Sequence, residues 1–188
     1  IPRWFDAGQA VLLPDNSRSL WLALGDSELD PLLAPSLGLA GTGPTAESEH
    51  YRLFQIEIPP RQHFREQDLL SLKQGNIAFG GEVQRVTEDG MLTLVSSWRQ
   101  EGEPRPVKLF LHVLDEAGSI AAQWDGLDVH WQGWRPQDLL RQIHRIDLTG
   151  LPPGAYRLVT GAYDPSSLER WQSTSGEDFI ELDKIVLP

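Results

Sequence analysis

The chain has 188 residues, a formal net charge of −11 and no cysteine. The length fits one domain, or a domain with a small appendage. The acidic balance argues against a nucleic-acid-binding protein, because contacts to phosphates need clustered Lys and Arg side chains. The lack of cysteine excludes a disulfide scaffold, a thiolate zinc site and a cysteine nucleophile. Apolar runs stay far below the roughly 18 residues of a membrane span.

The first 72 residues contain a few strand signals separated by loops. Residues 9–13 (QAVLL) and 20–24 (LWLAL) flank a turn-forming Pro-Asp-Asn-Ser cluster, which predicts a hairpin. A loop rich in Gly, Pro and Ser follows at 34–48. Residues 51–58 form the next predicted strand, which Pro59 and Pro60 end. We expect residues 62–72 to form a short helix or a linker.

From Asn76 onward, predicted strands follow one another closely. Asp89-Gly90 and Asp115 to Gly118 mark two hairpins, and Gly80-Gly81 indicates a β-bulge. The one helical turn that we expect spans 136–141 (PQDLLR), where Pro occupies the first helical position. The predicted strands are residues 77–86, 91–98, 107–114, 119–124, 142–148, 155–163 and 178–187.

These signals predict a mainly β protein. Short strands with turn chemistry between them are typical of an antiparallel β-sandwich, and we expect a jelly-roll-like one from 76 to 188. A smaller β-containing segment, residues 1–72, would pack against it and complete a sheet. In the strand 155–163, the alternation favours Tyr156, Leu158, Thr160 and Ala162 as the core face.

Several short motifs occur in an order that resembles a known family. They are residues 110–118 (FLHVLDEAG, similar to F-x-H-L-x-D-x-x-G), 122–126, 134–138, 151–158 (LPPGAYRL) and 161–165 (GAYDP). The order resembles the β-rich C-terminal domain of bacterial multi-pass membrane glycosyltransferases, the enzymes related to protein mannosyltransferases and aminoarabinose transferases. Residues 5–14, 20–24 and 30–33 resemble the segment that precedes that domain.

The resemblance implies where the chain lies in a larger enzyme, but not that the chain itself catalyses a reaction. In such enzymes, which use lipid-phosphate-linked sugars, the membrane part transfers the sugar. This chain would then be an excised, non-catalytic accessory domain on the extracytoplasmic face of the cell membrane. Its partners would be a glycan or lipid-linked sugar and the membrane part of the parent chain. The resemblance carries over no catalytic residue and implies no cofactor.

The stretch WDGLDVHWQGW, residues 124–134, is the most distinctive local feature. Its indoles could stack on sugar rings while Asp and His side chains bind hydroxyl groups. Equally, its indoles could pin a loop to the core, because Trp is highly buried on average. We expect Trp124 and Trp134 to be structural and Trp131 to be the most open, since its neighbours follow no strand or helix pattern.

The candidate ligand-binding residues come mostly from this stretch. Asp125 and Asp128 could hold Ca²⁺ through carboxylate oxygens. Turn and solvated positions are common for Asp, so we expect Asp125-Gly126 to form a turn and Asp128 to be solvated, and we predict no metal site. Trp171 lies in a polar stretch and is expected to be exposed. The predicted set is Asp125, Asp128, His130, Trp131 and Trp171.

Two other functions stay open. A free-standing β-sandwich enzyme, a glycoside hydrolase or an esterase, would show a pocket with converging carboxylates of raised pKa. A purely structural interaction domain would show a flat polar surface with all seven tryptophans buried.

Overall fold

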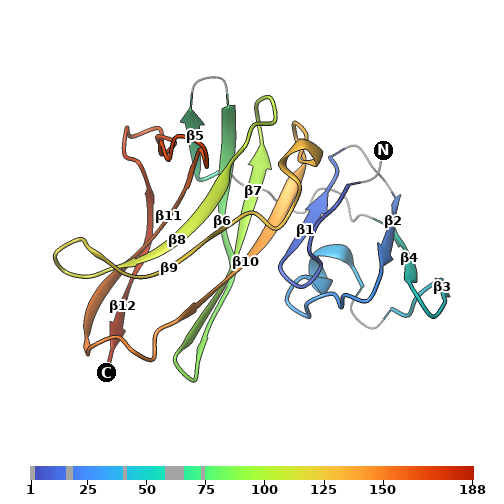
Figure 1. The fold of residues 1–188 in the computed structure, drawn as a ribbon, viewed down its shortest axis with the longest axis horizontal. Coiled ribbons are helices and arrows are strands. Elements are labelled where there is room, and N and C mark those ends of the chain that lie inside the picture. Colours follow the sequence, from blue (N-terminus) through green and yellow to red (C-terminus); the bar gives the residue numbers. More distant parts are fainter. Residues whose placement is uncertain (1–2, 16–18, 40–41, 58–65, 73–74) are drawn as a thin grey trace.

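The structure is a computed structural model that describes residues 3–15, 19–39, 42–57, 66–72 and 75–188. Its strands form three antiparallel sheets (Figure 1). The largest has the order β1 (Ala10–Leu13), β10 (Leu139–Asp147), β7 (Met91–Gln100), β6 (Gly75–Glu88) and β5 (Asp68–Leu72). The second has the order β12 (Ile180–Leu187), β11 (Gly154–Tyr163), β8 (Lys108–Leu114) and β9 (Ile120–Gly126). The third contains β2 (Ser19–Leu24), β4 (Arg52–Glu57) and β3 (Ala46–Glu47).

The two larger sheets pack face to face and bury a continuous apolar core. Alternate side chains of a strand point to opposite faces, so one face of each strand supplies the core. Trp98, Phe79 and Leu109 are fully buried between the sheets. Burying one such side chain contributes about 1.5–3 kcal/mol. Tyr156, Leu158, Thr160 and Ala162 are all buried, as the alternation predicted. The antiparallel β-sandwich is therefore confirmed.

The jelly-roll connectivity is not confirmed. Consecutive strands pair within one sheet as β6–β7, β8–β9 and β11–β12. The orders β6-β7-β10 and β8-β11-β12 correspond to strands A-B-E and C-F-G of an immunoglobulin-type sandwich. At the start of β11, the Tyr156 hydroxyl donates to the Pro152 carbonyl oxygen at 2.8 Å, which is the tyrosine corner of that architecture.

Strand β1 joins the sandwich to the small third sheet. Ala10 and Leu12 belong to the core between the two larger sheets. Val11 and Leu13 face the other way and pack with β2, β4 and the short 3-10 helix η1 (Ala34–Leu37). All four residues are buried, since β1 has apolar neighbours on both faces. The predicted hairpin is wrong: β1 pairs with β10 and β2 pairs with β4, so the two strands lie in different sheets.

Two helical predictions are also wrong. Asp68–Leu72 forms the strand β5 on the edge of β6; residues 62–65 of the same prediction lie outside the described ranges. The segment 136–141 makes only a turn, with Gln137 at a φ of 68°, before β10 begins at Leu139. Pro136 fits a first helical position, but pairing with β7 recruits the following residues into the sheet. Both edge strands of the largest sheet thus come from the first 72 residues.

Two hairpin turns and one β-bulge were predicted correctly from the sequence. Asp89 and Gly90 have φ values of 49° and 75° and close the β6–β7 hairpin. Gly118 has a φ of 81° in the β8–β9 hairpin. The register of β6 against β7 shifts between Phe79 and Glu82, where Gly81 has a φ of 90°, so the predicted bulge is confirmed.

A buried polar network lies in the core on β7 and β10. His144 Nε2 lies 2.6 Å from Ser96 Oγ, which also accepts a hydrogen bond from Trp98 Nε1 at 2.7 Å. The rings of His144 and Trp124 are nearly perpendicular, with 4.3 Å between ring centroids. Burial lowers the pKa of His144 to about 3, because the charged imidazolium would lose its hydration.

We predict that His144 sets part of the acid sensitivity of the fold. Between pH 6.5 and about 3, the unfolded chain binds a proton at this residue that the folded chain does not bind. The free energy of unfolding should therefore fall with falling pH, by up to about 1.4 kcal/mol per pH unit. Urea titrations followed by circular dichroism should show a weaker pH dependence for His144→Gln. His130→Gln, which removes an exposed imidazole, should keep the wild-type dependence. Parallel pH profiles for wild type and His144→Gln would contradict the assignment.

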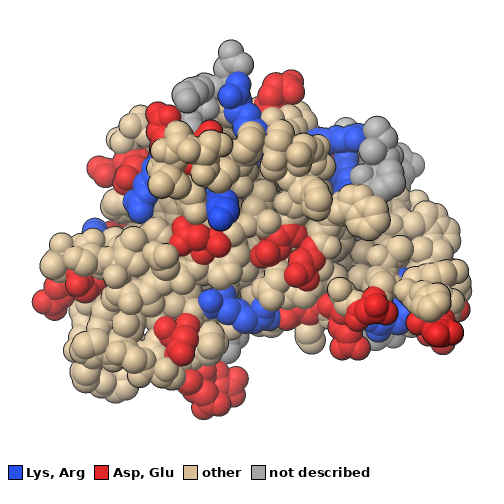
Figure 2. Space-filling model, viewed as in Figure 1, with Lys and Arg blue, Asp and Glu red and all other residues tan. Residues whose placement is uncertain are grey.

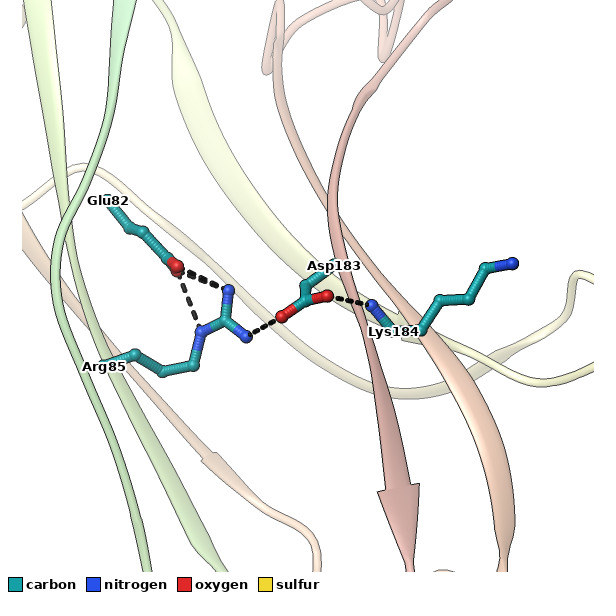
Figure 3. A network of polar contacts seen from close by, with 4 residues as sticks. All are labelled: Glu82, Arg85, Asp183 and Lys184. Carbon is teal, nitrogen blue, oxygen red and sulfur yellow. Dashed lines mark hydrogen bonds and ion pairs between the residues drawn. The ribbon is translucent and has the colours of Figure 1, made fainter.

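A polar network joins β6 of the largest sheet to β12 of the second sheet (Figure 3). The Arg85 guanidinium, from β6, lies between Glu82 of the same strand and Asp183 of β12. Its Nη2 is 2.6 Å from Glu82 Oε1, and its Nη1 is 2.7 Å from Asp183 Oδ2. The Asp183 Oδ1 accepts a hydrogen bond from the backbone amide of Lys184. The guanidinium therefore links the two sheets directly and holds the pKa of Asp183 below its ordinary value.

We predict that Arg85→Gln lowers the free energy of unfolding by about 1 kcal/mol, the range of partly exposed ion pairs that form a network. The loss should shrink at high salt, which screens these charges. Arg157→Gln is the matched control, because Arg157 pairs with Glu181 inside the second sheet at 3.2 Å and does not join two sheets. An Arg85→Gln loss no larger than the control loss would contradict the linking role.

Candidate functional site

The tryptophan-rich stretch 124–134 mainly packs the fold. Trp134 is fully buried, and its Nε1 donates to the Asp138 carbonyl oxygen at 3.0 Å. Trp124 lies on β9 and packs on the edge of the core, against His144. The structural roles predicted for these two indoles are confirmed. Trp131 lies in the 3-10 turn η2 (Trp131–Gly133) and is half-buried.

The backbone of the same stretch holds the N-terminal residues in place. Phe5 and Val129 form an antiparallel β-bridge. The Asp6 amide donates to the Asp128 carbonyl oxygen at 2.8 Å, and the His130 amide donates to the Trp4 carbonyl oxygen at 3.1 Å. The stretch therefore positions Trp4.

The structure does not bring all five predicted ligand residues together, since Trp171 is buried in the core and His130 is exposed. Both Asp125 carboxylate oxygens lie 3.4 Å from His112 Nε2 on the neighbouring strand β8. Asp128 accepts a hydrogen bond from Gln142 Nε2, and burial raises the pKa of its carboxyl group. His130 is exposed to solvent.

Neither aspartate follows the local prediction. Asp125 lies at the end of β9 rather than in a turn, and Asp128 is half-buried rather than solvated. Their carboxylates contact different side chains, His112 and Gln142. Among the residues that the structure describes, no group of three His, Asp or Glu side chains could hold a metal ion.

The predicted exposure of Trp171 is wrong, since only 1% of its surface is exposed. Its amide donates to the Ala162 carbonyl oxygen at 2.9 Å, and its indole enters the core between the sheets. A Cβ atom on Gly75 would come within 2.7 Å of its ring, so Gly75 makes room for the indole. Its polar neighbours Arg170 and Gln172 point away from the core because side chains alternate along an extended segment.

A concave feature lies between the N-terminal residues, β1 and β2. It is a pocket of about 630 Å³. Five consecutive residues of β2, Leu20 to Leu24, line it. Successive side chains of a strand point to opposite faces. Five consecutive residues can therefore line one pocket only if the pocket runs along the edge of β2, where both faces are reached. β1 and β2 each end a sheet, so among the described strands each has a partner on one edge only. The lining residues are Arg3, Trp4, Phe5, Ala7, Val11, Leu12, Pro14, Leu20, Trp21, Leu22, Ala23, Leu24, Gly25, Ser27, Leu37 and Arg135.

Two exposed indoles belong to this pocket. Trp4 is 69% exposed and Trp21 is 58% exposed, whereas Trp98, Trp134 and Trp171 are buried. Sequence reasoning missed both. The alternation of LWLAL was a usable signal, because it places Leu22 and Leu24 on the opposite face of β2 from Trp21. For Trp4 the sequence held no comparable signal, since its position depends on the bridge to Val129.

Charge is mixed on the surface that Figure 2 shows. Acidic and basic side chains are interspersed on this face, with no extended basic area. Such a face does not resemble the clustered basic surface that nucleic-acid binding requires.

No protein-family model, curated protein or solved structure matches this chain. Within the described ranges, no helix has the length and apolar character needed to cross a membrane.

Proposed function

We propose that this chain is a non-catalytic, extracytoplasmic accessory domain of a membrane glycosyltransferase, and that it recognises a saccharide at the pocket flanked by Trp4 and Trp21. The observation that carries the binding role is the exposure of these two indoles beside one pocket. The placement beside a membrane enzyme rests on the motif order from FLHVLDEAG to GAYDP.

Exposed indoles favour a ligand with both apolar and polar surface. Large apolar side chains in water are costly, and adjacent ones often mark a binding site. An indole face matches the apolar C–H face of a pyranose ring, while the ring hydroxyls need polar partners. Backbone groups on the free edge of β2 and the Ser27 residue at the pocket supply such partners. The size of the pocket falls within the usual range for small-molecule sites.

The other candidate functions lack comparable support. A glycosidase site needs a pair of carboxylates that flank the scissile bond. Within the described lining of this pocket there is no Asp, Glu or His residue. A purely structural domain would bury all seven tryptophans, but Trp4 and Trp21 are exposed. These observations favour recognition over hydrolysis at this site.

We predict that Trp4→Ala and Trp21→Ala each weaken saccharide binding by about tenfold, because each removes one stacking face worth about 1.4 kcal/mol. Isothermal titration against a panel of oligosaccharides and polyprenyl-phosphate sugars measures the affinity. Trp131→Ala is the matched control, since Trp131 does not line the pocket.

Two results would contradict this site. If no member of the panel releases or absorbs heat with the wild-type chain, saccharide recognition is wrong. If Trp131→Ala weakens binding while Trp4→Ala and Trp21→Ala do not, the binding residues lie in the 124–134 stretch instead.

A further inference from the structure

The described lining of the pocket is positively charged, whereas the chain as a whole is negatively charged. The chain has 27 acidic and 16 basic residues. Within the described lining, the charged residues are Arg3 and Arg135, and both are cationic. A cationic site on an acidic chain indicates a ligand that carries negative charge.

Arg3 is already neutralised inside the protein. Its Nη1 pairs with Asp138 Oδ2, and only 3% of the Asp138 side chain is exposed. The same Oδ2 accepts a hydrogen bond from the Arg135 amide at 2.9 Å. Asp138 thus connects the N-terminal residues to the segment that carries Arg135 and offsets one of the two positive charges.

Arg135 carries the second positive charge of the pocket lining, which Asp138 does not offset. Within the described part of the chain, its guanidinium has no carboxylate partner. Its backbone is held by the hydrogen bond to Asp138, and Trp134 beside it is anchored in the core. A guanidinium donates two parallel hydrogen bonds to a carboxylate or a phosphate, which gives geometric specificity as well as affinity.

We propose that the pocket takes an anionic saccharide, with the sugar ring against Trp4 and Trp21 and its carboxylate or phosphate group on Arg135. This inference rests on the proposed function and adds the chemical class of the ligand. The acidic group can come from a uronic acid within a glycan or from a sugar phosphate. Both present oxygen pairs that a guanidinium can bind.

The test compares three probes by isothermal titration: the neutral disaccharide galactobiose, the anionic disaccharide digalacturonate and the anionic monosaccharide galactose 1-phosphate. The wild-type chain should bind at least one of the two anionic probes about tenfold more tightly than galactobiose, which corresponds to one charge-assisted contact. This preference should shrink at high salt because ions screen the pair. The anionic probe that shows the preference identifies the source of the acidic group.

Arg135→Gln should remove the preference, because it should weaken binding of the preferred anionic probe about tenfold more than binding of galactobiose. Arg157→Gln, which removes an equal charge from the second sheet, should retain the preference. Unchanged circular dichroism and thermal unfolding of Arg135→Gln would show that the variant is folded. If Arg135→Gln does not fold, Arg135→Lys, which keeps the charge but loses the paired donors, should reduce the preference.

The possible failures are distinguishable. Equal binding of all three probes, still dependent on Trp4, would overturn the anionic ligand and leave saccharide recognition in place. The absence of binding by all three probes and by the wider panel would overturn both proposals. An equal loss of affinity for all three probes in a folded Arg135→Gln variant would assign Arg135 a role in shaping the pocket and overturn the contact proposed here.

Discussion

Burial of β1 on both faces is the constraint on which the rest of the architecture depends. Val11 and Leu13 pack against the small sheet, while the alternate residues of β1 fill the core of the sandwich. Arg145 of β10 adds a second contact between the sandwich and the N-terminal segment, because it pairs with Asp30 at 2.5 Å and binds Gln9 Oε1. Without these contacts, the apolar face of the three-stranded sheet would be left in water, and three strands alone rarely remain stable without such a covered face.

The pocket is a consequence of the same arrangement. β1 and β2 end different sheets, and the N-terminal residues cross beside them. Main-chain hydrogen bonds from Asp6 to Asp128 and from His130 to Trp4 hold that crossing in place, and Trp21 lies on strand β2, so backbone pairing positions both indoles. Asp138 adds a buried carboxylate that contacts both segments of the chain. The site is therefore built largely by backbone pairing and by one ion pair.

The sequence predicted the features that depend on local chemistry. Asp89-Gly90 supplied the positive φ values of a hairpin, Gly81 marked a bulge, and the period of two identified the buried face of β11. Partner choice between strands was beyond local reasoning. A Pro-Asp-Asn-Ser cluster between two apolar runs indicates a chain reversal, but it does not determine whether the flanking strands pair with each other or with distant strands.

The site was predicted less well for a related reason. Composition drew attention to residues 124–134, where many aromatic and polar side chains occur together, but several of them bond to residues outside the stretch or pack in the core. The polar neighbours of Trp171 suggested exposure, while its own side chain points inward. Trp4 becomes part of a site only through contacts more than 120 residues away along the chain, and no local pattern records such a contact.

The unequal exposure of the tryptophans also gives the chain an intrinsic optical label. Trp4 and Trp21 lie in water, while Trp98, Trp134 and Trp171 lie in an apolar interior. The indole emission of the first two should occur at longer wavelength and should be quenched selectively by iodide. A molecule that settles over the pocket would shift that component toward the blue and shield it from the quencher, so occupancy can be followed without a dye.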